Sequence, residues 1–548
     1  MLTVLTVIGG QSRKINMFVT RALAGSNFTP LLLLLLLISL TNFFWLSYNT
    51  LPPHWDWAAH MLSALKYHQA MSDYTQQPDL WSLTSVKAVL RNLLGVDQSV
   101  YPPLFPLVGS FMIFIAGPSI KWLSMTNMLF MALLLYGLFK IGKKIHSEES
   151  GVLSCIILCF YPVVFSLSRQ YMLEIALLAI TALSIYFLLY SEEFRNRAFT
   201  ALFGVSVGVG LLIKPTYLSY IVGPVCYVAS LVGYKMFIGS LPWREGVWRF
   251  CRFLPSLAVG LALAALWYGP NWDVFTRQFR RVVSLDNTGI SPFGIDSFLY
   301  HPNTIVHQIG LPFFILLLYG LYRLTRSVNS QNAWFLWIWA LSIYLIHTSS
   351  RLKTGTQVIA ILFPVAIISA IGILSITRWK RTVVTLVLLF GFFQFATLSI
   401  PENWLADKVG QFKWAGHYAS FPKKQDWKIE DALGSIGDQR ATVAVMSDHR
   451  FINPVTIRYY VFVLRLPLMT TPCHTIVRKG KDLRSYDFVI AKSDTGWIPR
   501  GAQGDYCLGN ADDYVQILKQ LDDKSQNFNI FRRFPLPDGT EMLIYKKS

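Results

Sequence analysis

The sequence predicts a polytopic α-helical membrane protein of about 11 to 13 transmembrane segments, followed by a C-terminal extracytoplasmic α/β domain. Of the 548 residues, 53% are hydrophobic and only 14% are charged, whereas ordinary soluble domains carry about 25% charged residues. Apolar runs recur from residue 29 to residue 399, and the charge density rises after residue 401. We therefore expect a cytoplasmic N-terminal segment (1–28), a transmembrane domain (29–400) and a soluble domain (401–548).

The apolar runs are separated by joints that alternate between basic and less basic composition. The positive-inside rule places Lys- and Arg-rich joints in the cytoplasm. The intervening joints, among them the first loop (51–101), then lie outside together with everything after Pro401. We expect an integral multi-pass protein of the bacterial inner (plasma) membrane. The basic joints are residues 140–144, 195–197, 235–252, 323–326 and 378–381.

Residues 103–117 are the exception among the apolar segments. This run is short, begins with Pro-Pro-x-x-Pro and ends in Gly-Pro. One crossing or three must separate the outside loop that ends at Tyr101 from the inside cluster at Lys143, so we expect this segment not to cross as a regular helix. Irregular backbone at membrane depth requires protein or a cavity around it. The alternative is that Lys143 does not lie inside.

The C-terminal region, residues 401–548, has the alternation of a small α/β domain. It contains no G-x-G-x-x-G or Walker sequence, so no nucleotide site is indicated. Strands are expected at 441–447, 485–494 and 541–547, and helices at 453–464 and 510–521.

The net charge of +19 is explained by topology in a membrane protein, and it favours membrane lipid phosphate over nucleic acid as the anionic partner. Six cysteines are present. Cys473 and Cys507 fall in the outside domain, where a disulfide or two free thiols are both open. The four others lie in or beside apolar segments and are typical of packing residues: Cys155, Cys159, Cys226 and Cys251.

The first outside loop carries the leading candidate for chemistry. Asp56 follows the first apolar segment by a few residues and stands between two tryptophans. A carboxylate at the mouth of a membrane cavity suits a general base that accepts the proton of a weak nucleophile. The competing interpretation is an N-cap of the helix that begins at Trp57. His54 and His60 flank this position, and a metal site built on them is a further alternative that lacks a fourth ligand.

A second acidic group, Glu174, heads an apolar helix shortly after Arg169. Its alternative interpretation is a carboxylate favoured by the helix dipole. Basic residues at outer helix ends, Lys214, Arg351 and Lys353, run against the charge bias and point to an anionic partner such as a lipid phosphate. Snorkelling toward the interface is their alternative role.

Taken in order, these landmarks resemble the polyprenyl-phosphate-sugar glycosyltransferases with the GT-C membrane fold, in the branch of protein O-mannosyltransferases and the aminoarabinose transferase of lipid A modification. The resemblance covers about residues 29–400. It rests on Asp56 in the first outside loop, on YPPLFPL (101–107), on Arg169 followed by Glu174, and on the outer joint from Lys353 to Pro364. Two positions depart from the family. Trp57 replaces the second acid of the loop, and Thr356-Gln357 replaces an Arg-Tyr pair.

The resemblance implies inverting transfer of a sugar from a polyprenyl-phosphate carrier to a protein, lipid or glycan acceptor, without a metal or another cofactor. A transporter or flippase of a lipid-linked or anionic solute is the alternative, although no internal repeat is seen. A non-catalytic scaffold is the third possibility. The expected catalytic residues are Asp56 and Glu174, and the expected substrate-binding residues are His60, Tyr101, Arg169, Lys214, Arg351 and Lys353.

Overall fold

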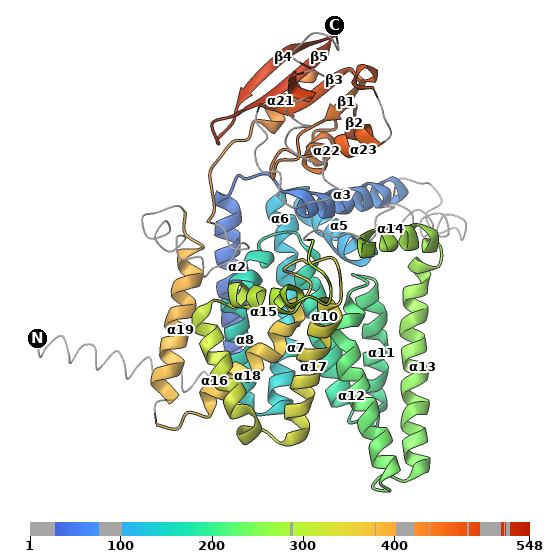
Figure 1. Ribbon diagram of the computed structural model, residues 1–548, viewed down its shortest axis with the longest axis vertical. Helices are drawn as coiled ribbons and strands as arrows, with labels where there is room; N and C mark the ends of the chain where they lie inside the picture. The colour runs from blue at the N-terminus through green and yellow to red at the C-terminus, as the bar shows by residue number, and fades with distance from the viewer. Residues whose placement is uncertain are drawn as a thin grey trace, which may run out of the picture.

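The computed structural model is a bundle of helices that carries a small α/β domain at one end (Figure 1). The bundle holds the long apolar helices, and α3 lies across it where the C-terminal domain begins (Figure 1). The described residues are 28–75, 101–284, 289–378, 380–401, 421–437, 439–478, 482–493, 517–519, 521 and 527–548.

Two groups of helices build the bundle. The first group is α2 (Thr29–Tyr48), α3 (Trp55–Thr75), α5 (Leu104–Ala116), α6 (Ile120–Met125), α7 (Asn127–Ile145), α8 (Glu148–Phe160), α9 (Pro162–Ser168), α10 (Leu173–Tyr190), α11 (Arg197–Leu211) and α12 (Tyr217–Phe237). The second group is α13 (Trp243–Tyr268), α14 (Trp272–Ser284), α15 (Ile295–Ile309), α16 (Leu311–Ser327), α17 (Ser330–Thr348), η1 (Ile359–Ile361), α18 (Leu362–Leu374) and α19 (Lys380–Thr397).

The helices confirm a polytopic membrane protein. Within the described ranges, 6 helices are long and apolar enough to cross a membrane, or up to 8 if each bent pair counts as one span. The bent pairs are α8–α9, which turns by 72° where Pro162 begins α9, and α15–α16, which turns by 116° at Gly310. Gly310 has a φ of +85°, a conformation that side-chain-bearing residues rarely adopt. Three shorter apolar helices complete the bundle, which accounts for the larger number expected from the sequence.

Residues 103–117 form α5, whose 13 residues rise only about 20 Å and are too short for a regular span. α5 packs against α3 and α6 near the C-terminal domain (Figure 1). Its first backbone N–H donates to the carbonyl of Leu212, and its Phe105 carbonyl accepts from the Tyr171 hydroxyl, so both contacts hold it at the outer end. The following span, α6–α7, then makes the one crossing that leads to Lys143.

The basic joints gather at the opposite end of the bundle, as the charge pattern predicts. Lys143 pairs with Glu148 at 2.6 Å, and Lys380 pairs with the adjacent Glu149 at 2.9 Å. The side-chain amide of Asn332, at the start of α17, donates to the carbonyl of Ile145 at 2.8 Å. Joints that are distant in sequence therefore meet at one end, which we call the basic end.

Small residues allow close contact between α11 and α13. A Cβ added to Gly204 would lie 2.0 Å from the Ser256 carbonyl oxygen, and one added to Gly208 would lie 2.4 Å from the Gly260 carbonyl oxygen. The spacing of these two glycines is the small-xxx-small pattern that lets membrane helices approach each other. Larger residues at these positions would force the pair apart.

The C-terminal domain contains a five-stranded sheet of order β2-β1-β3-β5-β4. The first three strands run parallel, and β5 and β4 run antiparallel to their neighbours. The strands are β1 (Ala441–Val445), β2 (Leu468–Pro472), β3 (Phe488–Lys492), β4 (Phe528–Pro535) and β5 (Glu541–Lys547), and the helices are α21 (Ile429–Ile436), α22 (Pro454–Val463), α23 (Cys473–Arg478) and η3 (Leu483–Ser485).

These elements confirm the strands expected at 441–447, 485–494 and 541–547 and the helix expected at 453–464. Of the helix expected at 510–521, residues 517–519 and 521 are helical and the others lie outside the described residues. Cys473 is disulfide-bonded. Cys507 lies outside the described residues, so its pairing with Cys473 stays a prediction.

Candidate functional site

The leading candidate, Asp56, occupies the first turn of α3, and its side chain is exposed. Trp55, directly before it, has a φ of +26°, which is strained for a residue with a side chain. His60 lies one turn further along α3, on the same face as Asp56, and is buried. This face of the helix therefore carries one exposed carboxylate and one buried imidazole.

Tyr101 brings the start of α5 to this face of α3. Its ring centroid lies 5.0 Å from that of His60 in an edge-to-face arrangement. The ammonium of Lys214 lies 5.7 Å from the centroid of the same Tyr101 ring, within the range of a cation–π contact. Two residues expected to bind substrate, Tyr101 and Lys214, are thus brought into contact.

Lys214 also forms an ion pair with Glu174. The distance between Nζ and Oε1 is 3.2 Å, and the side chains are 20% and 5% exposed, respectively. The second carboxylate oxygen of Glu174, Oε2, is buried and has no hydrogen-bond partner among the described residues. A buried carboxylate oxygen without a donor is costly, so this atom is suited to accept a hydrogen bond from a bound polar molecule.

Three charged side chains, those of Lys214, Asp56 and Glu174, affect the pKa of the Tyr101 phenol. Burial raises its pKa to about 12, the ammonium of Lys214 opposes this shift, and the carboxylates of Asp56 and Glu174 reinforce it. The Asp56 carboxylate is thus one of the charges that raise the pKa of this phenol. We call Asp56, His60, Tyr101, Glu174 and Lys214 the outer cluster.

A polar region extends the outer cluster toward the loop before η1. The Tyr220 hydroxyl donates to the Gln357 carbonyl at 2.9 Å, and the side-chain amide of Gln308 donates to the Gly355 carbonyl. Two further buried oxygens, Thr216 Oγ1 and Gln308 Oε1, have no partner among the described residues. Buried polar atoms of this kind are usually satisfied by ordered water or by a ligand.

Lys353 and Arg351 differ in position. Lys353 is 1% exposed and donates to the carbonyl oxygens of Thr348 at 2.6 Å and His347 at 3.2 Å. Its ammonium therefore holds the end of α17. Arg351 is exposed. The substrate-binding roles expected for Lys353 and Arg351 stay predictions.

Arg169 lies in a separate buried cluster between α2, α9 and α19. It is 2% exposed, and its guanidinium donates to Asn42 Oδ1 at 3.0 Å, to the Leu398 carbonyl at 3.2 Å and to Ser399 Oγ. The guanidinium also lies over the rings of Trp45, Phe165 and Phe395. These contacts tie three helices together, and the substrate-binding role expected for Arg169 stays a prediction.

The sequence analysis did not identify the contribution of the C-terminal domain. The indole N–H of Trp55 donates to Asp448 Oδ1 at 3.2 Å, and the Thr456 hydroxyl donates to the Pro53 carbonyl at 2.9 Å. Burial, together with the nearby guanidinium of Arg450, lowers the pKa of His54 to about 3. Contacts with the C-terminal domain therefore hold the residues that precede Asp56 in place.

One signal could have identified this contact. Asp448, His449 and Arg450 follow β1 after two intervening residues, and β1 is a parallel strand flanked on both sides. Residues at the carboxyl ends of parallel strands are where α/β sheets place ligand-facing groups. The polar run after a buried strand was visible in the sequence.

The alternative metal site on His54, Asp56 and His60 is not assembled by these contacts. The ring of His54 faces Trp57 at 5.7 Å, whereas the ring of His60 faces Tyr101. Within the described ranges, no group of three His, Cys, Asp or Glu residues could hold a metal ion.

A cavity of about 890 Å³ lies between α3 and the α22–β2 part of the C-terminal domain. Both charged and apolar side chains line it. The polar and charged ones are His68, Gln69, Ser72, Asp73, Arg458, Arg465 and Thr470.

A protein-family model described as dolichyl-phosphate-mannose-protein mannosyltransferase matches residues 100–267. A comparison with curated protein sequences finds no match. Among solved structures, ArnT from Cupriavidus metallidurans in the apo state has a TM-score of 0.58 and 13% identity over 95% of this chain and 98% of that chain. The same protein bound to undecaprenyl phosphate has a TM-score of 0.56 and 12% identity over 94% and 98%.

The archaeal oligosaccharyltransferase AglB from Archaeoglobus fulgidus, in complex with an inhibitory peptide and a dolichol-phosphate, matches with a TM-score of 0.51 and 10% identity. This alignment covers 93% of this chain and 74% of that chain. At such identities the structural matches establish the fold. The chain therefore has the GT-C fold, and residues 100–267 match the family model of dolichyl-phosphate-mannose-protein mannosyltransferases.

Proposed function

We propose that the protein transfers a sugar from a polyprenyl-phosphate carrier to an acceptor on the side of the membrane that bears the C-terminal domain. Transfer inverts the anomeric carbon, and Asp56 acts as general base. The observation that carries this proposal is the outer cluster, in which an open carboxylate on α3 acts on the same phenol as the cation Lys214. The basic end then faces the cytoplasm, as in a bacterial inner membrane.

The chemistry is a single displacement. The acceptor hydroxyl attacks the anomeric carbon while the carboxylate of Asp56 takes its proton. The bond between the anomeric carbon and the phosphate oxygen breaks, and its electron pair leaves with the polyprenyl phosphate. Attack opposite the leaving group inverts the configuration. An exposed carboxylate can meet an acceptor that arrives from solvent, which suits Asp56 better than the buried Glu174.

Lys214 is the cation best placed to neutralise the charge that develops on the leaving phosphate. Its ion pair with Glu174 fixes the ammonium at the outer mouth of α11 and α12 while its side chain keeps 20% exposure. Glu174 Oε2, which lacks a donor among the described residues, accepts a hydrogen bond from the sugar. The two carboxylates of the outer cluster thus have different roles. Asp56 takes the proton of the acceptor, and Glu174 accepts a hydrogen bond from the sugar.

We assign two cavities of the structure to the substrates. An apolar cavity of about 720 Å³ between α2, α5, α6 and α7, lined by Leu35, Met112, Trp122 and Met128 among others, suits a prenyl chain. The polar cavity of about 890 Å³ between α3 and α22 suits the acceptor. α3 and α5 connect the two cavities to the residues that react.

The test is turnover in liposomes with a labelled polyprenyl-phosphate sugar and purified protein. Asp56→Asn should lower the rate of polyprenyl-phosphate release by about 10²- to 10⁴-fold, the usual contribution of a general base. Asp273→Asn, which changes an exposed carboxylate in the first turn of α14, is the matched control and should retain the wild-type rate.

Release that Asp56→Asn leaves unchanged would refute the assignment of the base. Flux of a labelled solute without release of polyprenyl phosphate would instead identify a transporter. The stereochemistry follows from the anomeric coupling of the isolated product, and retention would exclude the single displacement.

A further inference from the structure

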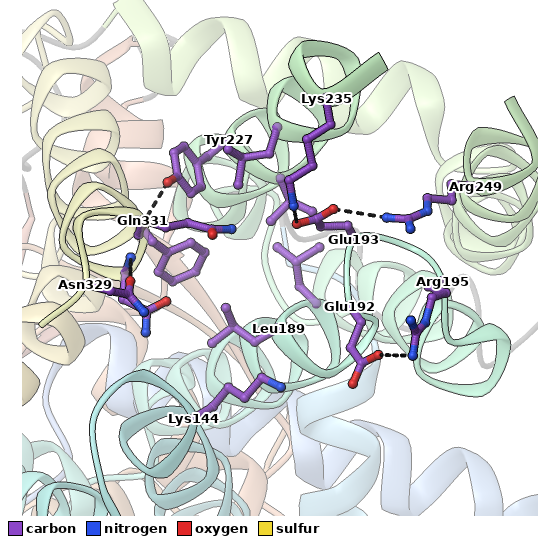
Figure 2. Close-up of a pocket in the computed structure, with 15 residues that line it drawn as sticks. Lys144, Leu189, Glu192, Glu193, Arg195, Tyr227, Lys235, Arg249, Asn329 and Gln331 are labelled. Carbon is purple, nitrogen blue, oxygen red and sulfur yellow. Dashed lines mark hydrogen bonds and ion pairs between the residues drawn. The ribbon is translucent and has the colours of Figure 1, made fainter. Parts of the chain in front are cut away.

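A third cavity, of about 500 Å³, lies at the basic end of the bundle (Figure 2). It is enclosed by the last turns of α10 and α12 and by the start of α17, with contributions from the ends of α7 and α13. The outer cluster and its polar extension occupy the other ends of α10, α12 and α17. The 18 residues of α10 rise about 27 Å, so the two sites are well separated. The proposed transfer reaction does not use this cavity.

Cations outnumber carboxylates in the wall of the cavity. Glu193 pairs with Lys235 through Oε1 and with Arg249 through Oε2 at 3.0 Å, and Arg249 also pairs with Glu245 at 3.3 Å, so these four charges balance. Glu192 pairs with Arg195 at 3.2 Å (Figure 2). With Lys144 as a fourth cation, the lining carries four positive and two negative side chains.

Lys144 is the cation that remains available. Its ammonium lies 5.2 Å from the ring centroid of Tyr190, and within the described part of the chain it has no ion pair. Figure 2 shows Lys144 on one side of the cavity and the amides of Asn329 and Gln331 on another, with Leu189 between them. The floor beneath these polar groups is apolar and includes Leu188, Val228, Leu231 and Phe335.

The backbone that presents the two carboxylates is strained. Glu192, Glu193 and Phe194 have φ values of +50°, +58° and +67°, three consecutive left-handed residues without a glycine. The left-handed conformation is unfavourable for residues with a side chain, because Cβ comes too close to the following carbonyl oxygen. Phe194 is buried and stacks on Phe253 at 4.3 Å, which holds the turn in place. Strain of this kind is typically retained where a side chain must face a particular site.

We propose that this cavity binds the phosphate of a membrane lipid head group or of a soluble phosphate ester, with Lys144 as the principal cation. The Gln331 amide completes the phosphate contact, and the compensated pairs at Glu192 and Glu193 form the wall that limits its size. The apolar floor accommodates the carbon chain that the phosphate bears. Positive pockets between membrane helices at the cytoplasmic side are suited to phosphate-containing head groups.

The test measures binding by native mass spectrometry of the full-length protein in detergent. The probes are phosphatidic acid, phosphatidylcholine as a neutral-head-group comparison, and sn-glycerol 3-phosphate as a soluble phosphate ester. Lys144→Gln should weaken binding of the phosphate-bearing probe by about tenfold, equivalent to about 1.4 kcal/mol. Lys140→Gln, one turn earlier on α7 and outside the cavity, removes the same charge and should leave binding unchanged.

The different probes distinguish a lipid head group from a soluble phosphate ester. Lys144-dependent binding of phosphatidic acid alone assigns a lipid head group, and Lys144-dependent binding of glycerol phosphate assigns a soluble ester. Equal losses in Lys144→Gln and Lys140→Gln would overturn the proposal, because the binding would then follow the overall charge of this end. Equal binding of phosphatidylcholine and phosphatidic acid by all variants would overturn it as well.

Discussion

The indole nitrogen of Trp55 donates a hydrogen bond to Asp448 at 3.2 Å, although 393 residues separate the two in sequence. Trp55 has a strained φ of +26° and immediately precedes Asp56. The C-terminal domain therefore holds the residue that sets the direction in which α3 begins.

Asp448→Ala should lower kcat of the proposed transfer by about tenfold with little change in KM for the lipid donor, because the bond positions Asp56 and does not contact the donor. Asp448→Asn keeps an oxygen acceptor for the indole and should restore most of the rate. Steady-state kinetics on both variants check the prediction. A larger effect on KM than on kcat, or a loss of activity in Asp448→Asn equal to that in Asp448→Ala, would contradict a positioning role.

The buried ion pair between Glu174 and Lys214 predicts a specific pattern of stability. Removal of either partner leaves the other charge buried, which typically costs about 3–5 kcal/mol. Glu174→Gln and Lys214→Met should each lower the apparent melting temperature of the protein in detergent. The double variant should be more stable than the sum of the single effects predicts, because neither charge remains. Additive effects would show that the two groups act independently.

Substitution of Arg169 can distinguish a structural role of this residue from a role in substrate binding. Its donors are satisfied by Asn42, Leu398 and Ser399, and a lysine cannot reproduce this planar arrangement. Arg169→Lys should therefore lower the apparent melting temperature while the folded fraction keeps the wild-type KM for the donor. The exposed Arg351→Lys is the matched control and should not affect stability. A raised KM at unchanged stability would instead assign Arg169 to the phosphate.

The sequence predicted elements whose signal is local. The 20-residue apolar helix α2 follows its apolar run, and the three inner strands β1, β3 and β5 were expected within a few residues of their observed bounds. Both edge strands, β2 and β4, were not. Edge strands are half exposed and carry polar residues or proline; β4 contains two consecutive arginines, and β2 ends at Pro472. The burial pattern that identifies an inner strand is therefore absent.

In the candidate site, too, features that depend on local spacing were predictable from the sequence, whereas contacts that depend on tertiary packing were not. The shared helix face of Asp56 and His60 depends only on their spacing of four residues. The contact of Lys214 with Glu174 depends on the packing of α10 beside α11 and α12, and the contact of Trp55 with Asp448 depends on the docking of a whole domain. Residues that look equivalent in sequence, such as Lys214 and Lys353, are separated by packing into a cluster member and a support for α17.

The buried imidazole of His54 predicts a loss of stability in mild acid. Burial and the neighbouring Arg450 lower its pKa in the folded protein to about 3, whereas an unfolded histidine titrates near about 6.5. Between these values the unfolded chain binds a proton that the folded chain does not. The free energy of unfolding therefore decreases as the pH falls from about 6.5 toward about 3.

The apparent melting temperature should drop by several degrees between about pH 7.5 and about pH 5. His54→Phe should flatten this dependence, because the ring contacts remain and the titration is lost. His307→Phe, in α15, which packs on α9, α16 and α17 and away from the C-terminal domain, serves as the control and should retain the wild-type slope. An unchanged slope in His54→Phe would show that the acid sensitivity arises elsewhere than at the contact between α3 and the C-terminal domain.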